Sequence, residues 1–139
     1  MYKVTGKGSA SKKKAWKWFS LYIRLRDCLV TTGTPTACKC VTCGKVVPYD
    51  DIDAGHAIPG RKNSVLLDET LVYGQCQMCN RFNGGEKQAF KIFLVKKHGS
   101  DWYEMKEQGS HEAVTITDAE FELLAKVYRL KVEKLRKLD

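Results

Sequence analysis

The hydrophobic residues near the N-terminus recur at the spacing of an α-helix. Four of them follow one another at intervals of four, three and four residues: Trp18, Tyr22, Leu25 and Leu29. This spacing places the side chains on one face, because a helix turns by about 100° per residue. We therefore predict an amphipathic helix over residues 12–30, which ends before the Gly and Pro of the turn-forming segment 32–35.

The pattern changes in the rest of the chain. Residues 38–85 contain short apolar pieces interrupted by Gly, Pro, Asn and Asp, which favours hairpins and loops. This middle part has too few large apolar side chains to fold by burial alone. Residues 86–139 return to helical spacing, and we predict one helix over 86–98 that is closed by Gly99, followed by a short helix capped by Ser100.

The C-terminal segment carries a clear helix start. Thr117 and Glu120 have the spacing of a capping box, in which each side chain bonds to the backbone N–H of the other residue, so they predict the start of a long helix. The apolar positions of that helix share one face: Phe121, Leu124, Ala125, Tyr128, Val132 and Leu135. This stripe could pack on its own domain or pair with a second copy, and the sequence leaves both possibilities open.

The composition is that of a folded, single-domain protein. The chain has 139 residues, 43% hydrophobic and 29% charged, which excludes collagen-like and disordered proteins. We expect one α+β domain over residues 1–139, since a single core usually organises a chain of this length. Charged residues interrupt the apolar segment near the N-terminus, so we expect no membrane span, no membrane partner and a cytoplasmic protein.

The charge of the chain indicates a polyanionic partner. The net charge is +8, and residues 1–26 contain no Asp or Glu. Residues 1–11 are expected to form a flexible basic tail. Nucleic acid fits such a surface, although charge alone does not separate it from an acidic membrane. The candidates for DNA binding lie on the predicted first helix: Lys12, Lys13, Lys14, Lys17 and Arg24.

The cysteines form two closely spaced pairs. Each pair has the motif Cys-x-x-Cys: Cys40 with Cys43, and Cys76 with Cys79. Each can offer two thiolates to one side of a tetrahedral ion, so the four together predict a structural Zn²⁺ site. Cys38 could substitute as a ligand, but the two-residue gap of the first pair chelates better. Cys28 lies on the predicted first helix, where we expect it to be packed.

Residues suited to phosphodiester hydrolysis lie between and beside the cysteine pairs. Asp53 and Asn80 offer oxygen atoms that can hold a divalent cation such as Mg²⁺ or Mn²⁺. A neutral His56 can take a proton from water, and Arg61 can clamp a phosphate through two parallel hydrogen bonds. These four residues are therefore candidates for a catalytic centre.

Each of these residues also has a structural explanation. A single His in a loop usually belongs to the surface or the core, the acidic pair 50–51 fits a solvated turn, and Asn80 could cap the turn after the last cysteine. His98 and His111 are expected to be structural or exposed. The location of His56 between two cysteine pairs is what favours the catalytic interpretation.

Several of these segments together resemble a known group of nucleases. The matching pieces run in order along about half of the chain: Phe19 to Asp27, Cys40-x-x-Cys43-Gly44, Asp53-Ala-Gly-His56, Arg61-Lys-Asn63, Asp68-Glu69 and Gln75-Cys-x-x-Cys-Asn80. They resemble the zinc-containing HNH, or His-Me finger, nucleases, and in particular the phage NinG/Rap recombination endonucleases. The Cys-x-x-Cys-Asn ending is also similar to phage endonuclease VII, a Holliday-junction resolvase.

The resemblance implies a fold and an activity. The fold is a small zinc-stapled ββα-metal centre in residues 38–85, flanked by helices. The activity is structure-specific cleavage of branched DNA in phage recombination, in the host cytoplasm if the protein is phage-encoded. His56 would be the general base, and Asn80 with Asp53 would hold the catalytic Mg²⁺. The chain departs from the pattern at Gly55, where many HNH proteins have Asp.

Two other functions fit the same residues. A noncatalytic zinc-ribbon DNA-binding protein would use His56 and Asn80 only as scaffold. A sequence-specific HNH nicking endonuclease would keep the chemistry but read base edges, and sequence does not reveal which side chains enter a groove. A homodimer through the C-terminal helix is a further expectation, because symmetric cutting of a DNA junction requires two active sites.

Overall fold

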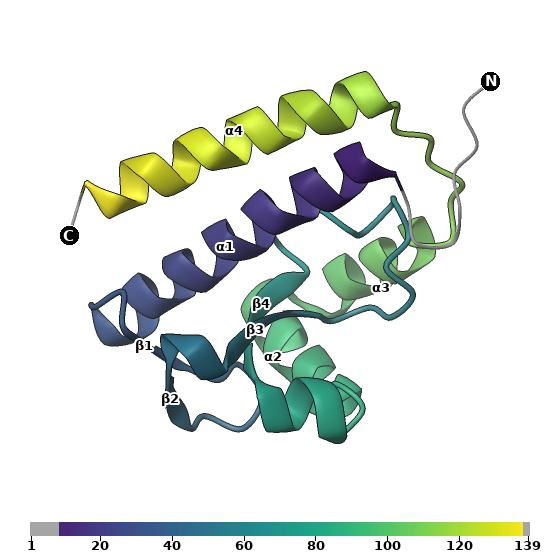
Figure 1. Ribbon diagram of the computed structural model, residues 1–139. Helices are drawn as coiled ribbons and strands as arrows, with labels where there is room; N and C mark the ends of the chain where they lie inside the picture. The colour runs from purple at the N-terminus through teal and green to yellow at the C-terminus, as the bar shows by residue number, and fades with distance from the viewer. Residues whose placement is uncertain (1–8, 138–139) are drawn as a thin grey trace.

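The computed structural model describes residues 9–137, so most of the predicted basic tail, residues 1–8, lies outside the described part. Within it, α-helices surround two small sheets (Figure 1). The elements in chain order are α1 (Ala10–Thr32), β1 (Ala37–Lys39), β2 (Val46–Pro48), η1 (Tyr49–Asp51), β3 (Ile52–His56), β4 (Val72–Cys76), η2 (Met78–Phe82), α2 (Lys87–His98), α3 (Ser100–Gly109) and α4 (Asp118–Arg136). The expected mixed α+β class is confirmed.

Helix α1 is longer than predicted. It begins at Ala10, because the Ser9 side chain accepts a hydrogen bond of 3.0 Å from the Lys12 backbone N–H and so caps the first turn. It ends at Thr32, and Gly33 follows with a φ of 77°, a left-handed conformation that suits glycine. The predicted turn at residues 32–35 therefore ends the helix as expected.

The buried face of α1 differs from the predicted stripe. Ala15, Phe19 and Ile23 are fully buried, whereas of the predicted stripe only Leu25 is buried and Trp18, Tyr22 and Leu29 are partly buried. The reason is that α1 lies between two layers: α4 runs parallel to it on one side, and strands β1, β3 and β4 contact its other side (Figure 1). A helix covered on two sides buries a wide arc, so a single apolar stripe does not define its core face.

Helix α4 begins as predicted and packs on α1. The Thr117 Oγ1 accepts from the Glu120 N–H at 3.1 Å, and the Glu120 carboxylate accepts from the Thr117 N–H at 2.9 Å, which confirms the capping box. Four members of the predicted stripe are buried: Phe121, Ala125, Tyr128 and Val132. They meet the α1 core within the same chain, for example Phe19, whose ring lies edge-on to Tyr128 at 4.9 Å. Pairing with a second copy stays a prediction.

The middle part folds into two antiparallel hairpins, as its sequence predicted. Strands β1 and β2 pair with each other, and β3 pairs with β4. In the second pair, Asp53 stands opposite Gln75 and His56 stands opposite Val72. Strand β4 leads directly into η2, so the residues after the last strand are held close to β3.

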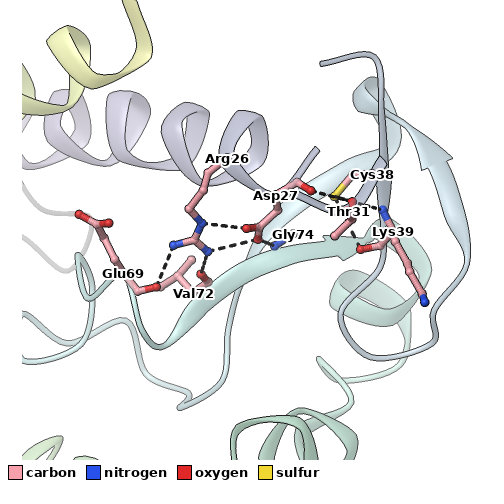
Figure 2. A network of polar contacts seen from close by, with 8 residues as sticks. All are labelled: Arg26, Asp27, Thr31, Cys38, Lys39, Glu69, Val72 and Gly74. Carbon is pink, nitrogen blue, oxygen red and sulfur yellow. Dashed lines mark hydrogen bonds and ion pairs between the residues drawn. The ribbon is translucent and has the colours of Figure 1, made fainter. Parts of the chain in front are cut away.

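A partly buried ion pair on α1 forms hydrogen bonds with the backbone in and just before strand β4. The Arg26 guanidinium donates to both Asp27 carboxylate oxygens and to the backbone carbonyls of Glu69 and Val72, at 2.8 to 3.2 Å (Figure 2). Asp27 in turn accepts a hydrogen bond of 2.7 Å from the Gly74 N–H. A side chain at residue 74 would collide with the sulfur of Cys38 on β1, so the close approach of β1 to β4 requires glycine there.

Helices α2 and α3 form a smaller layer around a second apolar cluster. Phe90 and Leu94 of α2 are fully buried there, together with Leu71 and Tyr103. Gly99 closes α2 with a φ of 95°, as predicted. Ser100 does not cap α3, contrary to the prediction, because it is already the first residue of that helix and Gly99 occupies the cap position.

No helix among residues 9–137 is long and apolar enough to span a membrane.

Candidate nuclease site and zinc cluster

The cysteines of the two Cys-x-x-Cys pairs meet in space. Their sulfur atoms all lie within 4.8 Å of one another: Cys40, Cys43, Cys76 and Cys79. The first pair follows β1, and its turn closes at Gly44, which has a φ of 77°. The second pair spans the end of β4 and the start of η2. Four sulfur donors in this arrangement fit a structural zinc ion, as predicted.

The remaining two cysteines lie outside the cluster. Cys28 and Cys38 are fully buried, and burial raises the pKa of the Cys38 thiol to about 12, so it stays protonated. Burial also acts to raise the pKa of Cys40, but hydrogen bonds, the largest from the Cys43 backbone, lower it to about 6. Burial also raises the pKa of the clustered Cys79 to about 12, so the ligand set rests on the geometry of the four sulfur atoms and not on thiol acidity.

A separate cavity of about 590 Å³ lies beside the cluster. Strand β3, η2 and one face of α1 supply most of its walls. Its charged, aromatic and amide-bearing lining residues are Trp16, Arg24, Asp53, His56, Arg61, Asn80, Arg81 and Lys87. Four of these are Arg or Lys and one is Asp, so the cavity favours an anionic ligand.

His56 ends strand β3 and lines the cavity from a buried position. Its Nε2 lies 3.1 Å from the Leu66 carbonyl oxygen, and its ring stacks on Trp16 with the centroids 5.0 Å apart. Burial, aided by the charges of Arg61 and Lys87, lowers the pKa of His56 to about 4. The ring is therefore neutral at pH 7. A carbonyl only accepts, so Nε2 carries the proton and Nδ1 keeps a free lone pair.

Asp53 and Asn80 both line the cavity and contact each other. The Asn80 Nδ2 donates to Asp53 Oδ2 at 3.0 Å. Within residues 9–137, the Asn80 Oδ1 accepts no hydrogen bond. This oxygen can therefore act as a ligand to a cation. Carboxylate and amide oxygens are ligands that Mg²⁺ accepts, so the donor set fits the predicted cation.

Arg81 engages the same carboxylate. Its Nε lies 2.8 Å from Asp53 Oδ2 and its Nη2 lies 2.9 Å from Oδ1, a two-pronged ion pair. The sequence interpretation did not include Arg81. Its position directly after Asn80 was the available signal, but no local pattern shows that residue 81 reaches back across 28 positions to Asp53.

Three further residues line the cavity: Trp16 and Lys87, which the sequence did not predict, and Arg24, which it did. Trp16, which was not predicted, contacts both His56 and Arg61, and the Arg61 guanidinium is 4.6 Å from the Trp16 ring centroid. Lys87 was also missed, and its Nζ donates to the His56 backbone carbonyl. Trp16 and the predicted Arg24 are eight residues apart on α1, so they share the face that lines the cavity.

The other predicted DNA-binding residues lie outside the cavity. Lys13, Lys14 and Lys17 are exposed, and Lys12 is partly buried. Lys14 pairs with Glu122 of α4 at 2.9 Å. These lysines therefore form a separate basic region at the start of α1.

The departure at Gly55 has a structural cause. A Cβ atom at residue 55 would lie only 2.2 Å from the Oε1 of Gln75, which is fully buried on the paired strand. Gln75 itself is fixed, since its Nε2 donates to the Gly85 carbonyl at 2.8 Å and to Thr42 at 3.0 Å. The packing of Gln75 thus excludes Asp before the His in this chain.

A comparison with known families gives one match. The family described as Bacteriophage Lambda NinG protein matches residues 4–139, nearly the whole chain. No curated protein and no solved structure gives a significant match.

Proposed function

Because the chain belongs to the bacteriophage lambda NinG family, we propose that it is a DNA endonuclease that depends on a divalent cation. The observation that carries this proposal is the arrangement of three residues in one basic cavity. His56 is neutral with a free Nδ1, and Asp53 and Asn80 meet beside it. A proton acceptor next to an oxygen-rich cation site is what hydrolysis of a phosphodiester requires.

In this proposal the chain's own residues divide the work of the reaction. The Nδ1 of His56 takes a proton from the attacking water, while the Leu66 carbonyl and the Trp16 ring hold the imidazole in place. Asp53 and Asn80 hold the cation, which when bound stabilises the charge on the phosphate and leaving oxygen. Arg61, which lies over Trp16, is available to the phosphate.

The substrate that we propose is branched DNA. The basic cavity and the net charge of +8 suit a polyanion. The resemblance of the sequence to phage recombination nucleases supports the choice of branched DNA and of an HNH-type site. Strands β3 and β4, followed by η2 and α2, have the order of a ββα-metal centre, which agrees with that resemblance.

The decisive experiment compares three substrates. Purified, zinc-loaded protein is incubated with a four-way junction, a flap and a linear duplex of the same sequence, with and without Mg²⁺. We expect cleavage only with Mg²⁺ and faster cleavage of the branched substrates. Equal cleavage of all three, concentrated at one sequence, would instead support a sequence-specific nicking enzyme.

A noncatalytic zinc-ribbon DNA-binding protein is the second candidate, and one observation favours it. The ion pair between Arg81 and Asp53 occupies both carboxylate oxygens, as a purely structural pair would. This candidate predicts DNA binding without cleavage under Mg²⁺, Mn²⁺ or Ca²⁺. Absence of cleavage by the wild type with each of these cations would replace our proposal by this one.

A further inference from the structure

The Arg81 guanidinium and a divalent cation need the same atoms of Asp53. Arg81 covers Oδ1 and Oδ2, and Asn80 also donates to Oδ2, at distances of 2.8 to 3.0 Å. A cation that bound Asp53 would meet the positive guanidinium at van der Waals distance. The two positive groups repel each other strongly at such a separation. Asp53 can therefore bind either the Arg81 guanidinium or the cation, but not both at once.

The two partners of this ion pair differ in freedom. Asp53 belongs to strand β3, where it stands opposite Gln75 of β4, and its side chain is only 17% exposed. The Arg81 side chain is 55% exposed, and it extends from η2 into the open cavity. The carboxylate is thus the fixed member and the guanidinium the movable one. Rotation of the Arg81 side chain would uncover Asp53 without a change in the backbone.

We propose that Arg81 competes with the divalent cation for Asp53. A DNA phosphate ends this competition when its oxygens accept the hydrogen bonds that the Arg81 guanidinium otherwise donates to Asp53. This inference rests on the proposed function. A phosphate offers a guanidinium the same two-pronged geometry as a carboxylate does. The cavity that contains Arg81 also contains Arg24, Arg61 and Lys87, so a phosphate bound there lies within reach of Arg81.

The consequence is a positive coupling between DNA and cation. DNA draws Arg81 from Asp53 and raises the affinity of Asp53 for the cation, and the cation frees Arg81 for DNA by the same factor. Arg81 is then a positioning residue with two partners. A partly exposed ion pair is worth only a few-fold in an equilibrium constant, so we expect a factor of about two to five.

The first test measures cation binding without DNA. Free Mn²⁺ is followed by electron paramagnetic resonance during titration of the zinc-loaded full chain. Arg81→Gln should bind Mn²⁺ about two- to fivefold more tightly than the wild type. The matched control is Arg129→Gln on α4, which removes an equally exposed Arg that pairs with Glu133. It should bind Mn²⁺ like the wild type, and Asp53→Asn should lose this binding.

A further variant separates competition for atoms from a general effect of charge. Arg81→Lys keeps the charge but loses the fork that covers both oxygens, so it should also bind Mn²⁺ more tightly than the wild type. The proposed competition is wrong if Arg81→Gln binds Mn²⁺ no more tightly than the wild type. It is also wrong if Arg81→Lys binds Mn²⁺ with the affinity of the wild type, because only the loss of charge would then matter.

The second test measures DNA binding with no added divalent cation. Asp53→Asn should release Arg81 and strengthen binding of a noncleaved duplex, by more than the same charge change at the exposed Asp51. The double variant of Asp53→Asn with Arg81→Gln should lose that additional gain, since the double-mutant cycle isolates the coupling. Equal gains for Asp53→Asn and Asp51→Asn would contradict the transfer of Arg81 to DNA.

These binding tests do not depend on cleavage. A wild type that cleaves DNA, combined with an unchanged Mn²⁺ affinity in Arg81→Gln, refutes only the role of Arg81. A wild type that never cleaves, combined with the expected change in Mn²⁺ affinity, refutes only the proposed nuclease activity.

Discussion

At the scale of single residues, the environment of His56 defines its chemistry. The Leu66 carbonyl fixes the proton on Nε2, and the Trp16 ring holds the plane of the imidazole. Burial among basic neighbours keeps the ring neutral. A general base must be unprotonated before the reaction, so His56 is ready to act throughout the neutral pH range without a carboxylate partner.

Substitution of His56 separates an enzyme from a binding protein. His56→Ala should lower the cleavage rate by ~10²–10⁴-fold, because the general base is lost, while DNA binding and zinc content stay unchanged. Rates on a four-way junction, with circular dichroism as the test of folding, check this. A folded His56→Ala protein that cleaves at the wild-type rate would refute the proposed mechanism.

Asn80 offers a comparison within the same cavity. Asn80→Ala should also slow cleavage, but higher Mg²⁺ or replacement by Mn²⁺ should restore part of the rate, since Asn80 holds a cation and does not transfer a proton. The same additions should not restore His56→Ala. Equal responses of the two variants would contradict this division of roles.

The low pKa of His56 also predicts a pH dependence of stability. The pKa of about 4 in the folded protein lies below the ordinary value of 6.5, so between these pH values the unfolded state binds the proton and the folded state does not. His56 therefore contributes stability fully above pH 6.5, and this contribution is lost as the pH falls towards 4. Urea unfolding at pH 7.5 and 5 should show an additional loss of about 2 kcal/mol in the wild type relative to His56→Gln. Equal losses would show that His56 titrates normally.

The sequence identified part of the site at this scale. His56, Asp53 and Asn80 could be selected because their chemistry and their distance from the cysteine pairs are visible in the chain. Trp16 and Arg81 could not, because their roles depend on partners 40 and 28 positions away, which only the fold brings near. Gly55 shows the same limit. Glycine is required there because a Cβ atom would collide with the buried Gln75 on the opposite strand, and the sequence does not reveal that contact.

At the scale of elements, α1 combines a structural role with a functional one. One side meets α4, another meets the strands, and the face with Trp16 and Arg24 lines the cavity. This explains why its spacing predicted a helix correctly but only part of its buried surface, such as Leu25. Periodicity reports one apolar stripe, whereas α1 is covered from two directions and buries Phe19 and Ile23.

The Arg26–Asp27 ion pair of α1, which bonds to the backbone of β4, is expected to stabilise this arrangement. Asp27→Ala should lower the free energy of unfolding by roughly 3 kcal/mol or more, because Arg26 would be left without its partner in a largely buried position. Asp51→Ala, at an exposed position, is the control and should change it by less than about 0.5 kcal/mol. Denaturant unfolding measures both, and similar small changes would mean that Arg26 finds other partners.

The lysines at the start of α1 are expected to bind DNA without sequence preference. Replacement of Lys12, Lys13, Lys14 and Lys17 by Ala should weaken binding to all DNA alike and flatten the dependence of affinity on salt, because phosphate contacts carry little base information. The control replaces four basic residues of α4: Lys126, Arg129, Lys134 and Arg136. It changes the net charge equally. The same salt slope in both variants would show that only net charge matters.

At the scale of the whole molecule, the cysteine cluster joins the two hairpins to the site. One cysteine pair follows β1 and the other leads from β4 into η2, which carries Asn80 and Arg81. The cluster therefore controls where these two side chains lie relative to Asp53 on β3. The sequence predicted the cluster because its spacing is local within each pair. It did not predict the cavity, which needs α1 and η2 in their folded positions.

Loss of zinc should therefore remove structure and function together. Cys79→Ala should lose the bound zinc, the near-ultraviolet circular dichroism of the folded core, DNA binding and cleavage, because cysteines make up most of the buried cluster around Val47 and Ile52 and zinc binding would supply much of its folding free energy. Cys38→Ala is the matched control, since Cys38 is equally buried but lies outside the cluster. It should retain one zinc per chain and lose at most some packing stability. Zinc content measured by atomic absorption, together with unfolding after addition of a strong chelator, tests both expectations. A chelator that removes the metal and leaves the fold intact would show that the cluster is not what holds the site together.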